Sequence, residues 1–188
     1  MKEIPYIIVQ AGGKGTRMKH LTRNKPKALV PVRNLPMIFH LFRAYADKKF
    51  IVIGDYKHDV LERYLESFCE VEYTIVSGSG HTGTCAGLQK ALSAVPENTP
   101  FMLIWSDLVL PENFVLPPPD ADYLGISKDF MCRWSYTSGR LIEMPSDTQG
   151  VAGCFIFRNK KDLVDIPSDG EFVRYLSEKD LTFKELPL

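Results

Sequence analysis

The sequence predicts an α/β protein with a Rossmann-like, mostly parallel (mixed) sheet and helices on both faces, that is, a three-layer α/β/α sandwich. Three short apolar runs lead to this prediction: Tyr6–Gln10, Phe50–Gly54 and Phe101–Trp105. Strands that are apolar on both faces and alternate with helices are typical of a covered parallel sheet. The chain has 188 residues, 45% of them hydrophobic, and no linker or internal repeat. We therefore expect one domain over residues 1–188.

The segments between these strands have the periodicity of amphipathic helices. Ile38, Leu41, Phe42 and Tyr45 fall at i, i+3, i+4 and i+7, which places them on one helical face. Similar apolar stripes predict helices over residues 60–68 and 86–92, with a strand over 71–76 between them. The first half, residues 1–110, therefore alternates strand and helix.

The second half, residues 111–188, is predicted to be richer in strands. Four prolines, at positions 111, 117, 118 and 119, exclude a helix interior or a central strand from its beginning. Strands are expected over 123–126, 140–143 and 151–157, followed by a helix near 170–177 and a strand over 181–186.

Composition and charge exclude several classes of function. The 23 Lys and Arg residues balance 23 Asp and Glu residues, so no overall basic surplus attracts nucleic acid or an acidic membrane. The first apolar run is too short for a signal peptide or a membrane span. The four cysteines are far apart and form no CxxC pair, which favours buried thiols in a reducing compartment. We expect a cytoplasmic protein that binds neither nucleic acid nor membrane.

The glycine-rich loop that follows the first strand is the most informative segment. It reads Gln-Ala-Gly-Gly-Lys-Gly-Thr-Arg over residues 10–17. Successive glycine N–H groups can form an anion nest, and Lys14 and Arg17 add positive charge. The loop is neither a Walker A motif, because Gly15 follows Lys14, nor a dinucleotide fingerprint, because Met18 stands at the third glycine position. A nucleoside triphosphate site is predicted, and a ligand-free turn is the alternative.

A series of motifs then resembles the sugar-nucleotide pyrophosphorylases, the sugar-1-phosphate nucleotidylyltransferases with a GT-A-like fold. The motifs are GGKGTR at 12–17, LT at 21–22, PKALVPV at 26–32 and Pro-Met-Ile at 36–38. The resemblance implies that Arg17 and Lys27 are catalytic and contact the phosphates. The residues that it implies around the triphosphate are Ala11, Gly12, Gly13, Lys14, Gly15 and Thr16.

Weaker similarities continue along the chain. Gly83 and Thr84 lie in a GTCAG run that resembles the family segment approaching the base and ribose. Asp107, after the strand Phe101–Trp105, resembles the aspartate that binds Mg²⁺. Glu143 and Gly153 match the positions that hold the acceptor's hydroxyl groups. The implied partners are an NTP and a phosphorylated small-molecule acceptor, and the implied reaction forms an NDP-sugar and pyrophosphate.

The chain differs from the family pattern at three places, and each difference leaves alternatives open. Ser77, Gly78 and Ser79 stand where relatives place a base-reading glutamine, so the base is undetermined. Met144 replaces a phosphate-binding lysine, so either Lys128, Arg133 or Arg140 substitutes, or the acceptor is a different phosphorylated alcohol, such as phosphocholine for a cytidylyltransferase.

The third departure is at the carboxyl end. The chain stops at Leu188, about where relatives have a WxDxG element with a second metal carboxylate, so we expect part of a longer polypeptide. A catalytically silent nucleotide-binding regulator is the alternative from a different class, and a homo-oligomer is left open.

Overall fold

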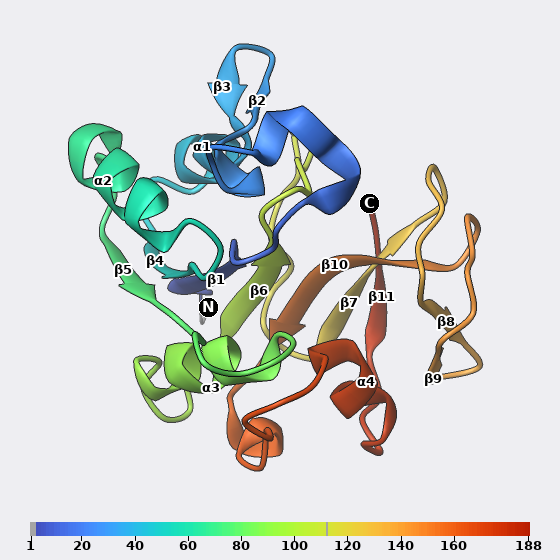
Figure 1. Cartoon of the computed structure of the whole chain (residues 1–188). Coiled ribbons are helices and arrows are strands. Elements are labelled where there is room, and N and C mark those ends of the chain that lie inside the picture. Colours follow the sequence, from blue (N-terminus) through green and yellow to red (C-terminus); the bar gives the residue numbers. More distant parts are fainter. Residues whose placement is uncertain (1–2, 112) are drawn as a thin grey trace.

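A central mixed sheet organises the protein (Figure 1). The computed structural model describes residues 3–111 and 113–188. The sheet has nine strands, with the order β11-β7-β10-β6-β1-β4-β5 and the hairpin β8-β9 attached through β10. These strands are β1 (Tyr6–Gln10), β4 (Lys49–Ile53), β5 (Tyr73–Val76), β6 (Phe101–Trp105), β7 (Tyr123–Ser127), β8 (Ser135–Thr137), β9 (Arg140–Ile142), β10 (Gly150–Phe157) and β11 (Lys184–Pro187). The helices are α1 (Met37–Ala44), α2 (His58–Phe68), α3 (Cys85–Ser93) and α4 (Phe172–Ser177), with 3-10 turns η1 (Thr16–Thr22), η2 (Lys27–Leu29) and η3 (Lys161–Leu163).

The strand directions confirm the predicted mixed sheet. β1 pairs in parallel with β4 and with β6, and β4 pairs in parallel with β5. β10 runs antiparallel to β6 and β7, and β11 is parallel to β7. The first half of the chain therefore supplies the parallel part, and the second half extends the same sheet.

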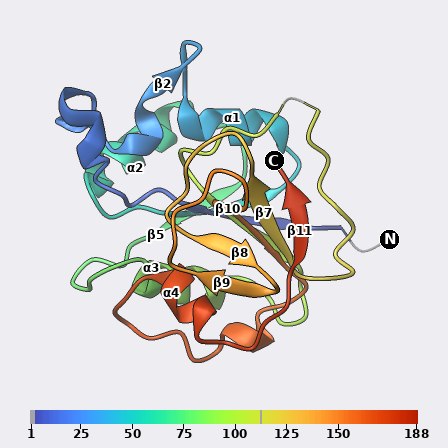
Figure 2. The same ribbon diagram turned by 90° about the vertical axis from the view of Figure 1, so that its right-hand side faces the viewer.

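Helices cover both faces of the sheet, as predicted. In Figures 1 and 2, α1 and α2 lie above the sheet, and α3 and α4 lie below it. Side chains along β1 alternate between the two cores: Ile8 belongs to the α3 and α4 side, and Ile7 and Val9 belong to the α1 and α2 side. Both faces of the central strands are thus covered by apolar side chains.

The sequence prediction missed one short hairpin and one strand of a second, whose other strand, β9, matches the expected strand over 140–143. The first joins β2 (Pro31–Val32) to β3 (Leu35–Pro36), and its turn residues Arg33 and Asn34 both have positive φ. The second joins β8 to β9 through Ser138 and Gly139, again with positive φ. The missed strands β2, β3 and β8 have only two or three residues, too few to show an alternating pattern, and prolines at positions 31 and 36 are unusual in strands.

The predicted buried thiols need one correction. Cys85, Cys132 and Cys154 are buried, but Cys69 is only partly buried because it lies at the end of α2. Burial raises the pKa of Cys154 to about 12, so that thiol stays protonated. Within the described part of the chain, no helix combines the length and apolar character needed to cross a bilayer.

Candidate functional site

The carboxyl ends of three parallel strands meet at one edge of the sheet. Gln10, the last residue of β1, is in register with Trp105 of β6 and with Ile53 of β4. The loops that follow are joined by backbone hydrogen bonds, because Ser106 N–H donates to Gln10 O (3.2 Å) and Tyr56 N–H donates to Gly12 O (3.3 Å). Such an edge is where open α/β sheets bind ligands.

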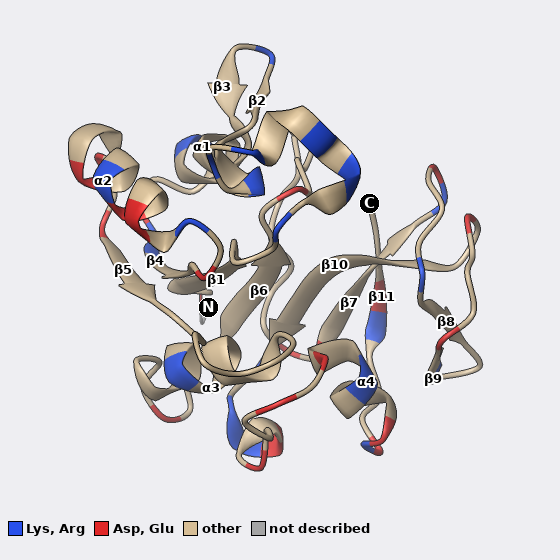
Figure 3. Ribbon diagram, viewed as in Figure 1, with Lys and Arg blue, Asp and Glu red and all other residues tan. Residues whose placement is uncertain are grey.

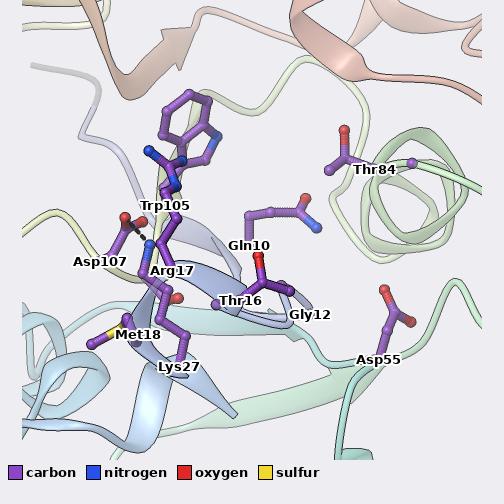
Figure 4. Close-up of a pocket in the computed structure, with 14 residues that line it drawn as sticks. Gln10, Gly12, Thr16, Arg17, Met18, Lys27, Asp55, Thr84, Trp105 and Asp107 are labelled. Atoms are coloured by element: carbon purple, nitrogen blue, oxygen red, sulfur yellow. Dashed lines mark hydrogen bonds and ion pairs between the residues drawn. The ribbon is translucent and has the colours of Figure 1, made fainter. Parts of the chain in front are cut away.

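A pocket of about 320 Å³ opens at this edge (Figure 4). The glycine loop forms one wall, the start of α3 another, and the turn after β6 a third. The predicted site residues that line it are Gly12, Gly13, Gly15, Thr16, Arg17, Lys27, Gly83, Thr84 and Asp107. Residues separated by up to 95 positions in the sequence therefore share one cavity.

The glycine loop is held in shape by its own residues. Gly15 has φ of +59°, a left-handed conformation that favours glycine. A Cβ at Gly15 would lie 3.0 Å from Cγ2 of Thr22 and 3.1 Å from Cβ of Lys27. The Thr22 hydroxyl donates to Gly15 O (3.1 Å), which fixes the turn before η1. The loop therefore brings its backbone close to the stem of Lys27.

Lys27 and Asp107 form an ion pair across the pocket. Nζ of Lys27 donates to Oδ2 of Asp107, and the two side chains are 27% and 38% exposed. Lys27 opens η2, whose next two residues are buried and anchor the turn. Arg17 points into the same cavity and has no ion-pair partner among the described residues. Two cationic groups therefore face one carboxylate here.

A second set of contacts fixes Gly83 and Thr84. The N–H groups of Thr84 and Cys85 both donate to Gly170 O, at 2.8 and 3.1 Å. A Cβ at Gly83, where φ is +86°, would lie 2.1 Å from that same oxygen. The Thr84 hydroxyl accepts from Phe172 N–H at 2.9 Å. The loop before α4 thus holds the start of α3 against the pocket.

Asp169 strengthens this attachment. Its Oδ1 accepts from the Thr82 N–H (2.7 Å) and the Thr82 hydroxyl (3.0 Å), and its Oδ2 lies 3.2 Å from Nδ1 of His81. These hydrogen bonds, the backbone one first, lower the pKa of Asp169 to about 2. The carboxylate is therefore charged over the whole physiological range.

Four predicted residues lie outside the pocket lining. Ala11 is fully buried and its N–H donates to Ile53 O at 2.8 Å, while Lys14 is exposed. Gly153, at a bulge in β10 with φ of +83°, lies against Trp105, where a Cβ would come within 2.2 Å of the indole. Glu143 follows β9. The roles of all these residues, inside the pocket or outside it, stay predictions.

Glu143 belongs to a charged cluster of its own. Its Oε1 accepts from Nε of Arg133 at 3.0 Å, and its Oε2 accepts from Nη2 of Arg174 at 2.6 Å. Arg133 also pairs with Glu171 at 3.1 Å. Met144, the next residue, is 53% exposed. Two guanidinium groups therefore contact Glu143, the residue before Met144, which stands where the resemblance implies a lysine. Arg174 was not among the residues considered from sequence.

The sequence prediction also missed Gln10, Asp55 and Trp105, which line the pocket. Each lies at or just after the carboxyl end of a predicted parallel strand, so strand-end position was the signal that could have found them.

The sequence also shows a local excess of positive charge near the glycine loop. Residues 4–46 contain no Asp or Glu, and Figure 3 shows basic residues gathered around η1.

The chain is similar in sequence to known nucleotidyltransferases over little more than half of its length. The chain is 32% identical over 112 residues to the UTP–glucose-1-phosphate uridylyltransferase AglF of Haloferax volcanii, covering 56% of this chain and 44% of that protein. It is 32% identical over 110 residues to the mannose-1-phosphate guanyltransferase of Saccharomyces cerevisiae, covering 54% of this chain and 30% of that one. The chain thus spans less than half the length of either relative.

The fold has a clear counterpart among solved structures. The crystal structure of HddC from Yersinia pseudotuberculosis superposes with a TM-score of 0.74 at 18% identity, over 98% of this chain and 90% of that one. The family described as the MobA-like NTP transferase domain matches residues 7–116, more than half of the chain. That segment contains the glycine loop, Lys27, Thr84 and Asp107, and the chain belongs to the MobA-like NTP transferase domain family.

Proposed function

We propose that this chain is a nucleotidyltransferase that transfers a nucleoside monophosphate from an NTP to a sugar 1-phosphate. The products are an NDP-sugar and pyrophosphate. One observation carries the proposal: the glycine loop, Arg17, Lys27 and Asp107 line a single pocket at the carboxyl ends of β1 and β6. The relatives named above, a uridylyltransferase and a guanyltransferase, act on sugar 1-phosphates by their names.

The pocket's charges fit the chemistry of this reaction. A phosphate oxygen of the acceptor attacks the α-phosphorus, and the bond to the bridging oxygen of the leaving pyrophosphate breaks. Negative charge builds on the phosphoryl oxygens, so the chain's task is positioning and neutralisation. Arg17 and Lys27 supply the positive charge. A cation about 4 Å from a phosphate oxygen contributes roughly 4 kcal/mol at an effective dielectric constant near 20.

Asp107 fits the role of a magnesium ligand. Its carboxylate lies at the pocket edge and is 38% exposed. No cluster of three or more His, Cys, Asp or Glu residues suited to a metal occurs over 3–111 and 113–188. A single carboxylate such as Asp107 suits Mg²⁺, which usually takes one or two carboxylates plus phosphate oxygens and water. When bound, Mg²⁺ would screen the charge of the triphosphate, and Asp107 would be its ligand from the described part of this chain.

The four free thiols support a cytoplasmic location for this activity, because a reducing compartment keeps cysteines unpaired.

Pyrophosphate release from a substrate panel tests the proposal. The panel combines the four common NTPs with several hexose 1-phosphates and with phosphocholine, in Mg²⁺ buffer. Release with a hexose 1-phosphate is the expected result, and release only with CTP and phosphocholine would favour a cytidylyltransferase. Tight NTP binding without release from any pair would identify a silent nucleotide-binding protein.

A further inference from the structure

Trp105 places a large aromatic surface in a pocket whose other groups are mostly polar or charged. It is the last residue of β6, lines the pocket and is partly buried. Among the described residues that line this pocket, it carries the only aromatic ring. An indole offers apolar area and a face with negative partial charge, so it does not serve the phosphates. The ring therefore fits a ligand group of a different kind.

The strand β10 departs from regular geometry where it meets this indole. Its pairing with β7 shifts between Val151 and Phe155, and Gly153 inside this bulge has φ of +83°. A Cβ at Gly153 would lie 2.2 Å from Cδ2 and from Cε3 of Trp105, so only a glycine lets the strand approach the ring. The ring centroid of Phe155 lies 6.5 Å from that of the indole. The bulge thus holds the indole at the pocket edge.

The indole lies at the same end of the pocket as the groups proposed to bind phosphate and metal. β6 and β10 lie on one side of β1, and β4 lies on the other. In Figure 4, Trp105 is on the same side of Gly12 as Lys27 and Asp107, and Thr84 is on the opposite side. A nucleotide with its phosphates at Lys27 and its ribose and base toward the polar groups of Thr84 leaves the indole free for the acceptor.

The strand that seats the indole belongs to the second half of the chain. β10 lies outside residues 7–116, the segment that matches the NTP transferase family. That segment supplies the glycine loop, Lys27 and Asp107, which suit the phosphates common to all NTPs. A surface completed by β10 suits the substrate that varies between relatives, and the two named above differ in their sugar phosphate by name.

We infer that Trp105 determines acceptor specificity by stacking against the sugar ring. The C–H groups on one face of a pyranose carry partial positive charge and meet the negative face of the indole, while the hydroxyl groups stay at the edge of the sugar ring. Covering that face also buries apolar area. The trimethylammonium group of phosphocholine is attracted to the same indole face by a cation–π contact, so the test includes it. The inference rests on the proposed activity and names a residue that holds its acceptor.

Binding of reaction products tests the inference without turnover. UDP, GDP, ADP and CDP are titrated by calorimetry in Mg²⁺ buffer, each alone and as its glucose conjugate, together with GDP-mannose and CDP-choline. Trp105→Ala is expected to weaken the best-bound sugar conjugate about tenfold and to leave the affinity of the matching diphosphate within about twofold, because only the sugar loses its apolar partner. Trp105→Phe keeps an aromatic face and should weaken the conjugate by less than about threefold.

Two further measurements keep the test decisive. Phe68→Ala removes a ring that is 62% exposed on α2, and it should change neither affinity. Tryptophan emission of the unaltered protein reports on the same contact even if Trp105→Ala does not fold. The other tryptophan, Trp134, is only 3% exposed, so Trp105 is the one that a ligand reaches. The sugar conjugate should change this emission more than the matching diphosphate does.

Each result either supports the inference or overturns it. Equal losses for conjugate and diphosphate in Trp105→Ala, no loss for either, or equal emission changes with both would overturn it and leave the proposed reaction standing. An effect confined to CDP-choline would also overturn it, because the indole would then hold a choline group. If none of these ligands binds, the inference and the proposed nucleotide site both fail. Binding of a sugar conjugate that depends on Trp105, without pyrophosphate release, would support the inference and reject the proposed reaction.

Discussion

Lys27 donates a hydrogen bond to the carboxylate of Asp107, and this ion pair links η2 to the turn that follows β6. The two residues are 80 positions apart in the sequence. Both side chains are partly exposed, and ion pairs of this kind contribute about 0–1 kcal/mol to stability. The pair is thus a weak structural contact between two groups that the proposed reaction needs separately, one for phosphate and one for metal.

Replacing Lys27 should therefore separate activity from stability. Lys27→Met is expected to slow pyrophosphate release by about a hundredfold or more, as the loss of a transition-state donor does in other enzymes. Its free energy of unfolding should change by less than about 1 kcal/mol. Initial rates and urea denaturation measure the two effects. Lys161→Met, at an exposed position of η3, is the control and should keep full activity. A rate within a few fold of the unaltered protein would contradict a role for Lys27 at the phosphates.

Two glycines of the loop should respond differently to alanine. Gly15 has positive φ and close neighbours in Thr22 and Lys27, so Gly15→Ala should lower the free energy of unfolding by about 1–2 kcal/mol. Gly13 has no heavy atom within 4 Å of an added Cβ, so Gly13→Ala should change stability by less than about 0.5 kcal/mol. Urea denaturation of both variants measures these changes in the free energy of unfolding. Equal stability of the two would show that the loop relaxes around an alanine at position 15.

The parallel core was predictable from sequence because its strands are continuous and apolar. Tyr6–Gln10 and Phe101–Trp105 coincide with β1 and β6 residue for residue. Burial on both faces leaves few residue types suitable for such strands, so the pattern is strong. The prediction was less exact in the second half of the chain, where the expected strand over 181–186 is β11 at Lys184–Pro187. Its side chains are mostly exposed, so burial imposes little pattern on them.

The phosphate side of the site was predictable for a similar reason. Glycines, Arg17 and Lys27 lie within one short segment, and their spacing carries the signal. Asp55 and Trp105 were missed because each reaches the pocket only through strand order, which brings β4 and β6 to either side of β1. Arg174 was missed because it meets Glu143 across 31 residues, a contact that no local pattern shows.

Asp169 should make the free energy of unfolding fall as the pH is lowered. Its pKa is lowered from the ordinary value of 3.8 to about 2 in the folded protein, so the unfolded chain binds more protons between these values. The contribution of Asp169 is complete above about pH 4 and disappears as the pH falls toward 2. Asp169→Asn should remove the loss of stability that Asp169 causes between these two pH values. Denaturation midpoints measured across that pH range test this. Asp147→Asn, at an exposed loop position, should keep it. An unchanged acid profile in Asp169→Asn would mean that the Thr82 contacts do not form in solution.

The guanidinium groups of Arg133 and Arg174, which contact Glu143, should bind the phosphorylated acceptor. An uncharged thioether cannot neutralise a phosphate, and Arg174 lies 2.6 Å from Glu143, the residue before Met144. Arg174→Gln should raise the KM for the acceptor about tenfold to a hundredfold, the range expected for one hydrogen bond to a charged group. The KM for the NTP should stay nearly constant, because Arg174 does not line the nucleotide pocket. Arg63→Gln, which breaks an exposed ion pair with Asp59 on α2, is the matched control and should alter neither value. If Arg174→Gln raises both KM values alike, the arginine supports the fold of α4 instead of the acceptor.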